Sequence, residues 1–322
     1  YILYTSGTTG TPKGVMLSQN NVAAAVLGQP VLGLAPEDRL LHSLTLACDG
    51  ATFEQWGALL NGASLAIVTA PTPSLDDLAA GIAGMRPTVT LAYAGIHHLM
   101  IDHRIEAFEG VRLAIAGGDV LSPDHTRRLM DRWPRLQVMN IYGPTETTWG
   151  SLLHEVRRAD TEGAIPIGRV LAHEEGLILD DEMRVLEGPA TGQLAIAGWG
   201  VGAGYHGRPD RTAEAFVPDP RPGRGGTVYL TGDLVRRESD GIHHFHGRVD
   251  RQVKLGGRRI ELDGVEAVLR RQPGVADAAV LLVPAPRGAP RLGAALRPDG
   301  PPGDPDAFVR AVLDGAAADL PD

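Results

Sequence analysis

Short apolar runs alternate with amphipathic helical patterns through the first half of the chain. Helical patterns cover residues 18–28, 51–62 and 122–133, with Ser18 or Asn20 as the expected N-cap of the first helix. Ser122 is the expected N-cap of the third helix, with Pro123 at its first position. The runs that indicate strands are residues 1–6, 64–68, 88–92, 111–117 and 136–143. This alternation predicts an α/β fold of layered, parallel sheets.

The pattern changes after about residue 160. Shorter strand-like runs separated by turn residues follow at 175–180, 192–198, 227–237 and 241–250, and they predict a small β-rich subdomain at about 165–245. Beyond it, the pattern predicts a hairpin, a helix and a further strand, at 251–262, 263–272 and 275–283. We therefore expect a large domain over 1–249 and a small α+β domain over 250–322.

Composition narrows the class of protein. The chain has 322 residues, of which 43% are hydrophobic, and 30 basic against 39 acidic side chains give a net charge of −9. An acidic chain without a basic tract argues against nucleic acid as a partner. The lone cysteine, Cys48, cannot form an internal disulfide and fits a reducing compartment. With neither a signal peptide nor an apolar run of membrane-spanning length, the sequence predicts a cytoplasmic protein that does not bind a membrane.

The chain begins with a strand-like run and then the stretch TSGTTGTPKG, residues 5–14. It holds five hydroxyl side chains, three glycines and Lys13 before a predicted helix. Backbone N–H groups at glycine turns, hydroxyl donors and a lysine suit a phosphate. It is not the common P-loop, because Lys13 stands between Pro12 and Gly14 rather than before Ser or Thr. The alternative is a flexible polar turn.

Three further stretches carry candidate chemistry. In NIYGPTETT (140–148), Asn140 and Tyr142 could face a base, Thr145 a phosphate and Glu146 a magnesium ion, which prefers hard oxygen ligands. The alternative is a turn with a capping box from Thr145 to Thr148. In YLTGDL (229–234), Asp233 could accept hydrogen bonds from two sugar hydroxyls, or it could belong to a plain β-turn. The charged stretch at 247–262 could be a solvated hairpin.

Taken together and in this order, the stretches resemble the adenylation domains of nonribosomal peptide synthetases. These domains belong to the wider adenylate-forming family, with acyl-CoA synthetases and luciferases. The resemblance covers nearly the whole chain. The matching stretches are TSGTTGTPKG, ACDGATFEQWGALLNGASL, NIYGPTETT, GQLAIAGWGVGAGYHGRPDRTAEAFVPDP, VYLTGDLVRR and GRVDRQVKLGGRRIEL. The implied fold is the layered adenylate-forming one.

The resemblance implies that ATP and a carboxylate give an acyl-adenylate and pyrophosphate. Tyr142 would stack on adenine, Asp233 would bind the ribose hydroxyls with help from Arg248, Thr145 would touch the α-phosphate and Glu146 would hold Mg²⁺. Asp250 would be the hinge of the small domain. The implied catalytic residues are Lys13, Thr145, Glu146 and Arg248. The implied nucleotide-binding residues are Thr5, Ser6, Gly7, Thr8, Thr9, Gly10, Gly118, Asn140, Tyr142, Gly143 and Asp233.

Asp49 bears on the substrate class. It stands where amino-acid-activating members carry an aspartate for the substrate ammonium, although Cys48 and Ala51 replace a common Phe and a common Ser. The alternative is a helix N-cap. The residues at the other pocket positions carry no charge, which predicts a neutral and mostly apolar amino acid as the substrate. Gly50 would enlarge the substrate pocket, and Trp149 would reduce its volume. These positions are Gly50, Phe53, Leu91, Ile115, Gly117, Ile141, Trp149 and Gly150.

The family resemblance also implies partners. The hairpin at 247–262 would approach a phosphopantetheine thiol on a peptidyl carrier domain outside this chain, within a set of synthetase modules. Relatives have a further segment before the opening loop. They also have a lysine beyond the position where this sequence ends, and neither Lys13 nor Lys254 matches that lysine. We therefore expect an internal piece of a synthetase, poorly folded and nearly inactive alone. An acyl- or aryl-CoA ligase and an inactive docking module are the alternatives.

Overall fold

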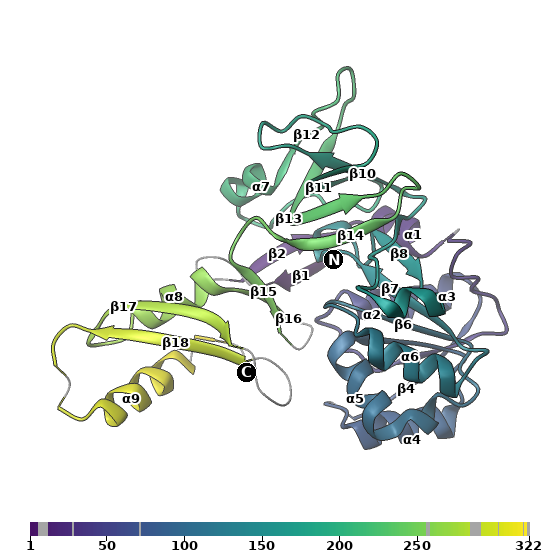
Figure 1. Cartoon of the computed structure of the whole chain (residues 1–322), viewed down its shortest axis with the longest axis horizontal. Coiled ribbons are helices and arrows are strands. Elements are labelled where there is room, and N and C mark those ends of the chain that lie inside the picture. The colour runs from purple at the N-terminus through teal and green to yellow at the C-terminus, as the bar shows by residue number, and fades with distance from the viewer. Residues whose placement is uncertain are drawn as a thin grey trace. The chain divides into compact units, whose positions relative to one another are not determined.

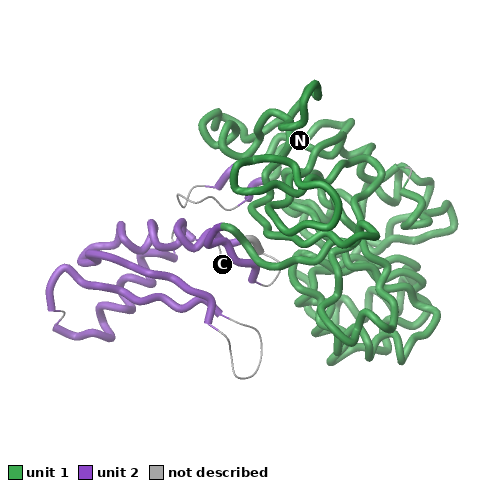
Figure 2. Tube along the Cα trace, turned by 45° about the horizontal axis from the view of Figure 1, so that its top comes forward, with its two compact units in different colours: residues 1–3, 14–249 green, residues 4–13, 250–322 purple. Residues whose placement is uncertain are grey.

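A computed structural model describes the chain as two compact units. Unit 1 comprises residues 1–3 and 14–249, and unit 2 comprises residues 4–13 and 250–322 (Figure 2). The residues that the structure describes are 1–5, 12–27, 29–70, 72–255, 258–283, 291–301, 303–317 and 319–320. The predicted nucleotide-binding residues Ser6, Gly7, Thr8, Thr9 and Gly10 lie outside these ranges.

Unit 1 is built around a seven-stranded sheet in the order β4-β3-β5-β6-β7-β8-β9. The strands from β4 to β7 are parallel, whereas β8 and β9 continue the sheet with antiparallel pairing. The expected α/β fold is confirmed, with this antiparallel end as an addition to it. The strands are β3 (Arg39–His42), β4 (Ser64–Ile67), β5 (Val89–Tyr93), β6 (Leu113–Gly117), β7 (Gln137–Tyr142), β8 (Leu152–Glu155) and β9 (Arg169–Val170).

Helices cover both faces of this sheet, as its strand sequences require. All five residues of β6 are buried, and alternate residues point to opposite faces. Ala114 and Ala116 pack with helices α4, α5 and α6, while Leu113 and Ile115 pack with α1, η1 and α3 (Figure 1). The helices are α1 (Gln19–Val26), α2 (Gly50–Thr52), η1 (Phe53–Gly57, a π-helical turn), α3 (Ala58–Leu60), α4 (Leu75–Met85), α5 (Ala94–Arg104), η2 (Ile105–Phe108, 3₁₀) and α6 (Pro123–Arg132).

The predicted helix starts are confirmed where their caps form. Ser18 caps α1 and makes a capping box with Asn21, and Ser122 caps α6 with Pro123 at the first position. The helix expected at 51–62 is present at 50–60, but its centre is the π-helical turn η1. A π-helical turn changes the direction of the side chains relative to a regular α-helix. The apolar periodicity of the sequence does not reveal such a turn.

The β-rich part of unit 1 is an antiparallel sheet in the order β10-β11-β13-β12, with β14 paired to β13. Its two faces bury separate apolar clusters, one around Ile178, Leu194 and Ile196 and the other around Leu179 and Val228. The strands are β10 (Glu174–Leu179), β11 (Ala190–Gly198), β12 (Phe216–Pro218), β13 (Thr227–Arg237) and β14 (His243–Arg248), and the helices of this part of the chain are η3 (Thr145–Thr147), η4 (Arg158–Glu162) and α7 (Pro209–Ala215).

Unit 2 packs helices α8 and α9 against a hairpin of two strands around Val268, Leu269 and Val280. Its elements are β15 (Gln252–Leu255), β16 (Arg258–Glu261), α8 (Leu262–Arg270), β17 (Val275–Val283), β18 (Arg291–Pro298) and α9 (Pro305–Ala317). The strands that flank the opening loop, β1 (Ile2–Thr5) and β2 (Lys13–Met16), form a two-stranded sheet.

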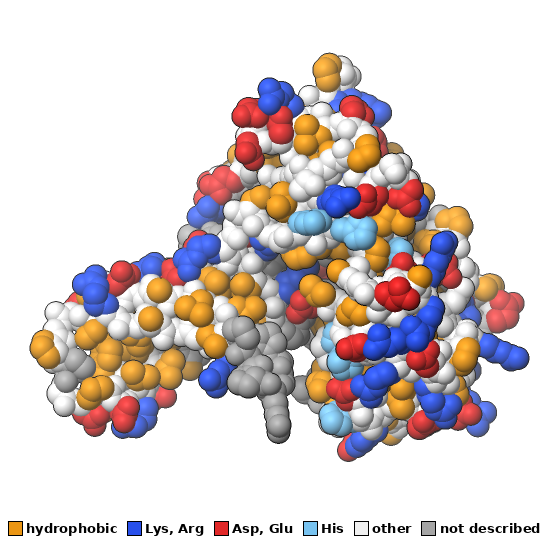
Figure 3. All heavy atoms as spheres, in the orientation of Figure 1, with side chains coloured by type: hydrophobic (Ala, Val, Ile, Leu, Met, Phe, Trp, Pro, Cys, Tyr) orange, Lys and Arg blue, Asp and Glu red, His pale blue; other side chains and the backbone are white. Residues whose placement is uncertain are grey.

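Charged side chains are interspersed on the surface of unit 1 (Figure 3). On the outer side of α5 and α6, the arginines pair with carboxylates, as in Arg128 with Asp102 and Arg132 with Glu106, both at 2.5 Å. None of the helices in the described ranges combines the length and the apolar character that a bilayer crossing requires.

Candidate active site

The predicted site residues of unit 1 gather where parallel strands end. Strands β5, β6 and β7 run in one direction, and Gly117 at the end of β6 lies beside Tyr93 of β5 and Ile141 of β7. The carboxyl ends of parallel strands are where α/β proteins bind ligands. The fold therefore brings Gly117, Gly118, Tyr142 and Gly143 to one edge of the sheet.

Asp49 and Thr145 are in direct contact at this edge. The hydroxyl of Thr145 donates a hydrogen bond of 2.5 Å to Oδ2 of Asp49. Asp49 stands at the N-cap position of α2, but its backbone is helical and its side chain makes no capping hydrogen bond. Asp49 thus holds the N-cap position of the alternative reading, but its carboxylate is directed at the loop after β7 instead of at the helix N-terminus.

The predicted substrate pocket is an apolar cluster. Phe53 and Trp149 stack with ring centroids 4.1 Å apart and an interplanar angle of 10°. Leu91, Ile115 and Ile141 belong to the same buried cluster, so five of the eight predicted positions pack together. Aromatic stacking of this kind adds about 0.5–1.5 kcal/mol beyond the buried area.

Three glycines of the pocket are in close contact with neighbouring groups. A Cβ added to Gly117 would lie 2.2 Å from the carbonyl oxygen of Ile141, so β6 and β7 can approach only without a side chain there. A Cβ at Gly50 would lie 2.6 Å from Cδ1 of Leu44. Leu44, which the sequence analysis did not single out, therefore occupies the space expected to be open beside Gly50. At Gly150, a Cβ would lie 2.7 Å from Cδ1 of Ile141.

Leu44 is held by a buried carboxylate. Glu54 of η1 is 1% exposed and accepts hydrogen bonds from the backbone N–H groups of Ser43 and Leu44 and from Nδ1 of His42, the last at 2.7 Å. Burial raises the pKa of Glu54, while His42 lowers it. Glu54 thereby fixes the loop between β3 and α2, which precedes Asp49.

Tyr142, Asp233 and Arg248 form a second cluster. The hydroxyl of Tyr142 donates to Oδ2 of Asp233, and Nη1 of Arg248 donates to Oδ1 of the same carboxylate at 2.6 Å. Asp233 and Arg248 are paired residues on β13 and β14. Burial and the neighbouring Asp233 carboxylate raise the pKa of Tyr142 well above its ordinary value. The structure thus brings together three residues predicted to contact adenine and ribose.

Glu146 is fully buried and has a partner that the sequence analysis missed. The hydroxyl of Tyr205 donates to Oε1 of Glu146 at 2.7 Å, and the N–H of Gly202 donates to the backbone carbonyl of Glu146 at 2.8 Å. Tyr205 lies in the GVGAGY stretch, where the sequence offered no polar signal beyond the tyrosine itself. A carboxylate is a ligand type that Mg²⁺ prefers, so Glu146 fits its predicted role chemically. No cluster of three or more metal-ligating side chains is found in the part of the chain that the structure describes.

The two described ends of the opening loop lie in unit 2. Oγ1 of Thr5 is buried and has no hydrogen-bond partner among the described residues, which fits a donor reserved for a ligand. Nζ of Lys13 lies 3.9 Å from Oε1 of Glu261 on β16, and both side chains are about nine-tenths buried. Asp250, the predicted hinge, is the first residue of this unit after Val249, and its carboxylate accepts from the N–H of Gln252 at 3.0 Å.

The side chain of Asn140, predicted to lie near adenine, is hydrogen-bonded within the protein. Its amide nitrogen donates to the carbonyl of Pro166 at 2.8 Å, and the residue is 4% exposed. This contact ties β7 to the segment before β9. Gly118, directly after β6, adopts φ +76°, which favours glycine there.

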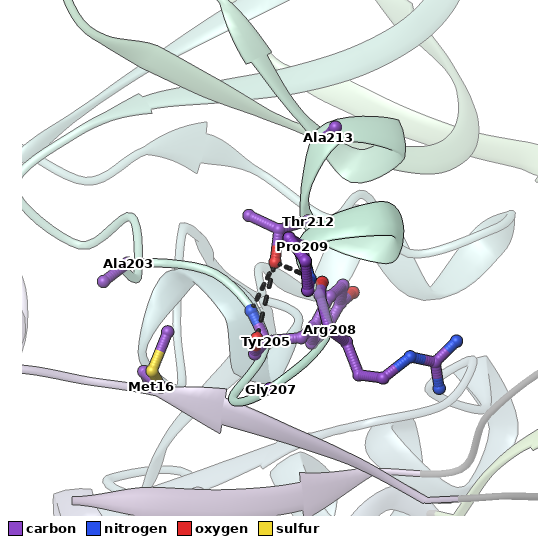
Figure 4. Close-up of a pocket in the computed structure, with 8 residues that line it drawn as sticks. All are labelled: Met16, Ala203, Tyr205, Gly207, Arg208, Pro209, Thr212 and Ala213. Atoms are coloured by element: carbon purple, nitrogen blue, oxygen red, sulfur yellow. Dashed lines mark hydrogen bonds between the residues drawn. The ribbon is translucent and has the colours of Figure 1, made fainter.

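Two pockets lie on unit 1. One has a volume of about 400 Å³ and is lined by Met16, Tyr205, Arg208 and Thr212, among others (Figure 4). In it, the hydroxyl oxygen of Thr212 accepts from the N–H of Tyr205 at 2.9 Å, so the pocket wall holds the residue that reaches Glu146. The other, of about 510 Å³, lies near His154 and Arg169.

Comparison with known proteins identifies the family. The family model described as "AMP-binding enzyme" matches residues 1–206. A linear gramicidin synthase of Brevibacillus parabrevis is 39% identical over 298 residues, which are 92% of this chain and 4% of that protein. A plipastatin synthase of Bacillus subtilis is 39% identical over 295 residues, or 91% of this chain and 11% of that one. The chain thus spans a small fraction of the length of these relatives.

Solved structures show the same relationship. Holo-PA1221, an NRPS protein containing adenylation and PCP domains, has a TM-score of 0.88 and 36% identity, over 97% of this chain and 54% of that one. The adenylation domain AlmE of Vibrio cholerae, solved with glycyl-adenosine-5′-phosphate, has a TM-score of 0.85 and 26% identity, over 99% and 60%. The chain therefore belongs to the AMP-binding enzyme family, within which it resembles the adenylation domains of nonribosomal peptide synthetases.

Proposed function

We propose that the chain activates an amino acid with ATP, giving an aminoacyl-adenylate and pyrophosphate. The observation that carries the proposal is the Asp49 carboxylate, which lies beside the apolar Phe53–Trp149 stack and accepts from Thr145. A carboxylate at the edge of an apolar pocket suits a substrate that has an ammonium group and an uncharged side chain. We infer a neutral, mostly apolar amino acid, since an unpaired charge in such a pocket is costly.

In this proposal, the remaining clusters bind different parts of the ATP molecule. Tyr142 binds adenine, Asp233 and Arg248 bind the ribose, Thr145 contacts the α-phosphate, and Thr5 and Lys13 contact the outer phosphates together with residues 6–10. Asn140, Gly118 and Gly143 shape the edge of the sheet beside adenine. Their contribution is positioning and fixed charge, which lower the barrier because they need no reorganisation during the reaction.

Glu146 is the residue that would hold Mg²⁺, which neutralises phosphate charge when it is bound. Tyr205 orients the carboxylate for this purpose. In the proposed second step, the aminoacyl group passes to the phosphopantetheine thiol of a carrier domain among other synthetase modules, with Asp250 as the hinge of the small domain. We place the reaction in the cytoplasm, where ATP is available and a lone cysteine stays reduced.

The test is amino-acid-dependent ATP–pyrophosphate exchange with the full-length protein and each proteinogenic amino acid. Asp49→Ala removes the proposed ammonium partner, and Asp181→Ala is the matched control because Asp181 is exposed on the turn after β10. We expect exchange with an apolar amino acid that is lost in Asp49→Ala and kept in Asp181→Ala. Exchange only with acids that lack an amino group would make the protein an acyl or aryl ligase, and no nucleotide binding at all would indicate a docking module.

A further inference from the structure

An irregular segment after β11 connects three parts of unit 1. We call this segment, residues 199–206, the strap. Apart from a bridge between Tyr205 and Val15, it has no regular helix or strand. Backbone groups outside regular secondary structure need other hydrogen-bond partners. The strap has them in helix α1, in the loop after β7 and in strand β2.

The side chain of Asn21 joins α1 to the first half of the strap. Asn21 is 8% exposed, and its Nδ2 donates to the carbonyl of Trp199 at 2.6 Å and to that of Val201 at 3.0 Å. Oδ1 of Asn21 accepts from the backbone N–H of Ser18 at 2.7 Å, as part of the capping box of α1. Because Oδ1 faces a donor, the amide nitrogen is the atom that faces the two carbonyls of the strap. All hydrogen-bonding groups of this amide are thus in use.

The second half of the strap is hydrogen-bonded to β2, the strand after the opening loop. The N–H of Ala203 donates to the carbonyl of Met16 at 2.9 Å, and the N–H of His206 donates to the carbonyl of Gly14 at 2.8 Å (Figure 4). The strap is therefore held at both of its ends, by α1 at the first and by β2 at the second.

Between these two anchors, the strap contacts the loop after β7. The hydroxyl of Thr148 donates to the carbonyl of Gly200 at 2.7 Å. The N–H of Gly202 donates to the backbone carbonyl of Glu146 at 2.8 Å, and the Tyr205 hydroxyl donates to Oε1 of the same residue at 2.7 Å. The strap thus contacts both the backbone and the carboxylate of Glu146.

The fit between the strap and its neighbours is close. A Cβ added to Gly202 would lie 2.9 Å from the carbonyl oxygen of Met16 and 3.3 Å from that of Glu146, so a side chain there would push the strap away from them. Thr148 adopts φ +59°, a conformation that persists in a residue other than glycine only where the surroundings hold it. Its hydrogen bond to the strap is one such contact.

We propose that the strap fixes the position of Glu146 and that Asn21 is the positioning residue that holds the strap in place. The two hydrogen bonds from Asn21 lie immediately before Gly202 and Tyr205, which are the strap residues that contact Glu146. The strap contacts are independent of any activity, whereas their effect on the use of Mg²⁺ rests on the proposed adenylation function.

The first test compares Asn21→Asp with Asn20→Asp in the full-length protein. Aspartate at position 21 keeps an oxygen that accepts from Ser18, but a second oxygen replaces the amide donor and faces the two carbonyls of the strap. Asn20 is the matched control, because it is the preceding residue of α1, is exposed, and gains the same charge in the first turn of the helix.

A second pair of variants perturbs the strap from the other side. Thr148→Val keeps the shape of the side chain and removes the donor to Gly200. Thr126→Val is its control, because Thr126 is equally buried and its hydroxyl donates to the carbonyl of Ser122, at the start of α6, at 2.8 Å. This pair separates the loss of a strap contact from the loss of any buried hydroxyl.

The first readout is amide hydrogen–deuterium exchange of the folded protein without substrate. In Asn21→Asp and in Thr148→Val, the amides of the strap should exchange with deuterium about ten-fold faster or more. The amides of α1 should keep their protection in Asn21→Asp, because the acceptor of its capping box remains. The two control variants should match the unmodified protein over the strap.

The second readout is the Mg²⁺ dependence of ATP–pyrophosphate exchange. If the strap positions Glu146, Asn21→Asp should raise the Mg²⁺ concentration for half-maximal activity about five-fold or more. The KM for the amino acid should stay within about two-fold, because Trp149 of the proposed pocket is held by its stack on Phe53. General damage to the fold would change both quantities together.

Unchanged deuterium exchange of the strap in either Asn21→Asp or Thr148→Val would overturn the proposal. A strap that exchanges faster in Asn21→Asp while the Mg²⁺ requirement stays the same would also overturn it, because Glu146 would then be positioned by other contacts. If the strap exchanges faster but no amino acid supports pyrophosphate exchange in the unmodified protein, the strap contacts stand and the proposed function fails.

Discussion

The hydroxyl of Thr145 donates to the carboxylate of Asp49 across 2.5 Å, although 96 residues separate them in the sequence. One residue belongs to the loop after β7 and the other to the start of α2. The sequence predicted a phosphate contact for the first and an ammonium contact for the second. Their hydrogen bond means that the two halves of the proposed substrate, the amino acid and the α-phosphate, meet at this pair.

This pair gives the first prediction. Thr145→Val removes the donor and keeps the shape, which deprives the Asp49 carboxylate of this hydrogen bond and costs about 1–3 kcal/mol. We expect kcat/KM in pyrophosphate exchange to fall about 10–100-fold, and Thr145→Ser to retain most of it. Unchanged kinetics in Thr145→Val would mean that the contact has no role in the reaction.

The second prediction concerns the cluster of Tyr142, Asp233 and Arg248. Asp233→Asn removes the charge that pairs with Arg248 at 2.6 Å and should weaken ATP binding about ten-fold or more, because the buried guanidinium loses this carboxylate. Tyr142→Phe keeps the ring and loses one hydrogen bond, so its cost should be about 1 kcal/mol. Calorimetric titration with ATP measures both. An ATP affinity in Asp233→Asn equal to that of the unmodified protein contradicts the assignment.

A third prediction addresses side-chain selection. Trp149 stacks on Phe53, and its indole fills one side of the pocket. Trp149→Leu should shift the preference towards bulkier apolar amino acids, by about 10–200-fold in relative kcat/KM for each methylene accommodated. Trp56→Leu is the control, since Trp56 lies on the same π-helical turn as Phe53 but is 43% exposed. The same shift in both variants would show that the effect is general rather than local.

The fourth prediction is a pH dependence of stability. His97 of α5 is buried and packs edge-on against Phe108, and burial lowers its pKa to about 3, with smaller effects from His98 and His125. A histidine whose pKa is lowered on folding stabilises the native state above its unfolded value of about 6.5, and this stability is lost as the pH falls towards the native pKa.

Replacing His97 by leucine should therefore make unfolding less sensitive to pH between about 6.5 and 4. The variant should gain relative to the unmodified protein as the pH falls in this range. His206→Leu serves as the control, because His206 is exposed. Parallel stability curves for His97→Leu and the unmodified protein would show that His97 is not buried in the neutral form.

The strand ends that carry many of the proposed site residues could be predicted, because they follow directly from local patterns. Apolar runs marked β6 and β7, so Gly117, Tyr142 and Thr145 could be placed at strand ends. Parallel strands end at one edge, and this rule predicts that such residues lie close together. Hydroxyl, carboxylate and aromatic residue types then suggested their chemistry.

What the sequence could not predict are contacts between residues far apart in the chain. Tyr205 reaches Glu146 across 59 positions. No spacing or motif in the sequence indicates this interaction, because the tertiary packing of the 200–205 segment creates it. The π-helical turn that directs Glu54 at Leu44 could not be predicted from the sequence either, since its apolar pattern resembles that of an ordinary helix.

Amino-acid activation through Asp49 is tested most sharply by comparing the preferred amino acid with its des-amino carboxylic acid in pyrophosphate exchange, for the unmodified protein and for Asp49→Asn. If Asp49 binds the ammonium, the unmodified protein should favour the amino acid by a factor that corresponds to about 2–5 kcal/mol, and Asp49→Asn should lose most of this preference. Equal use of both acids by the unmodified protein, or a preference that survives in Asp49→Asn, would mean that Asp49 does not bind the substrate ammonium.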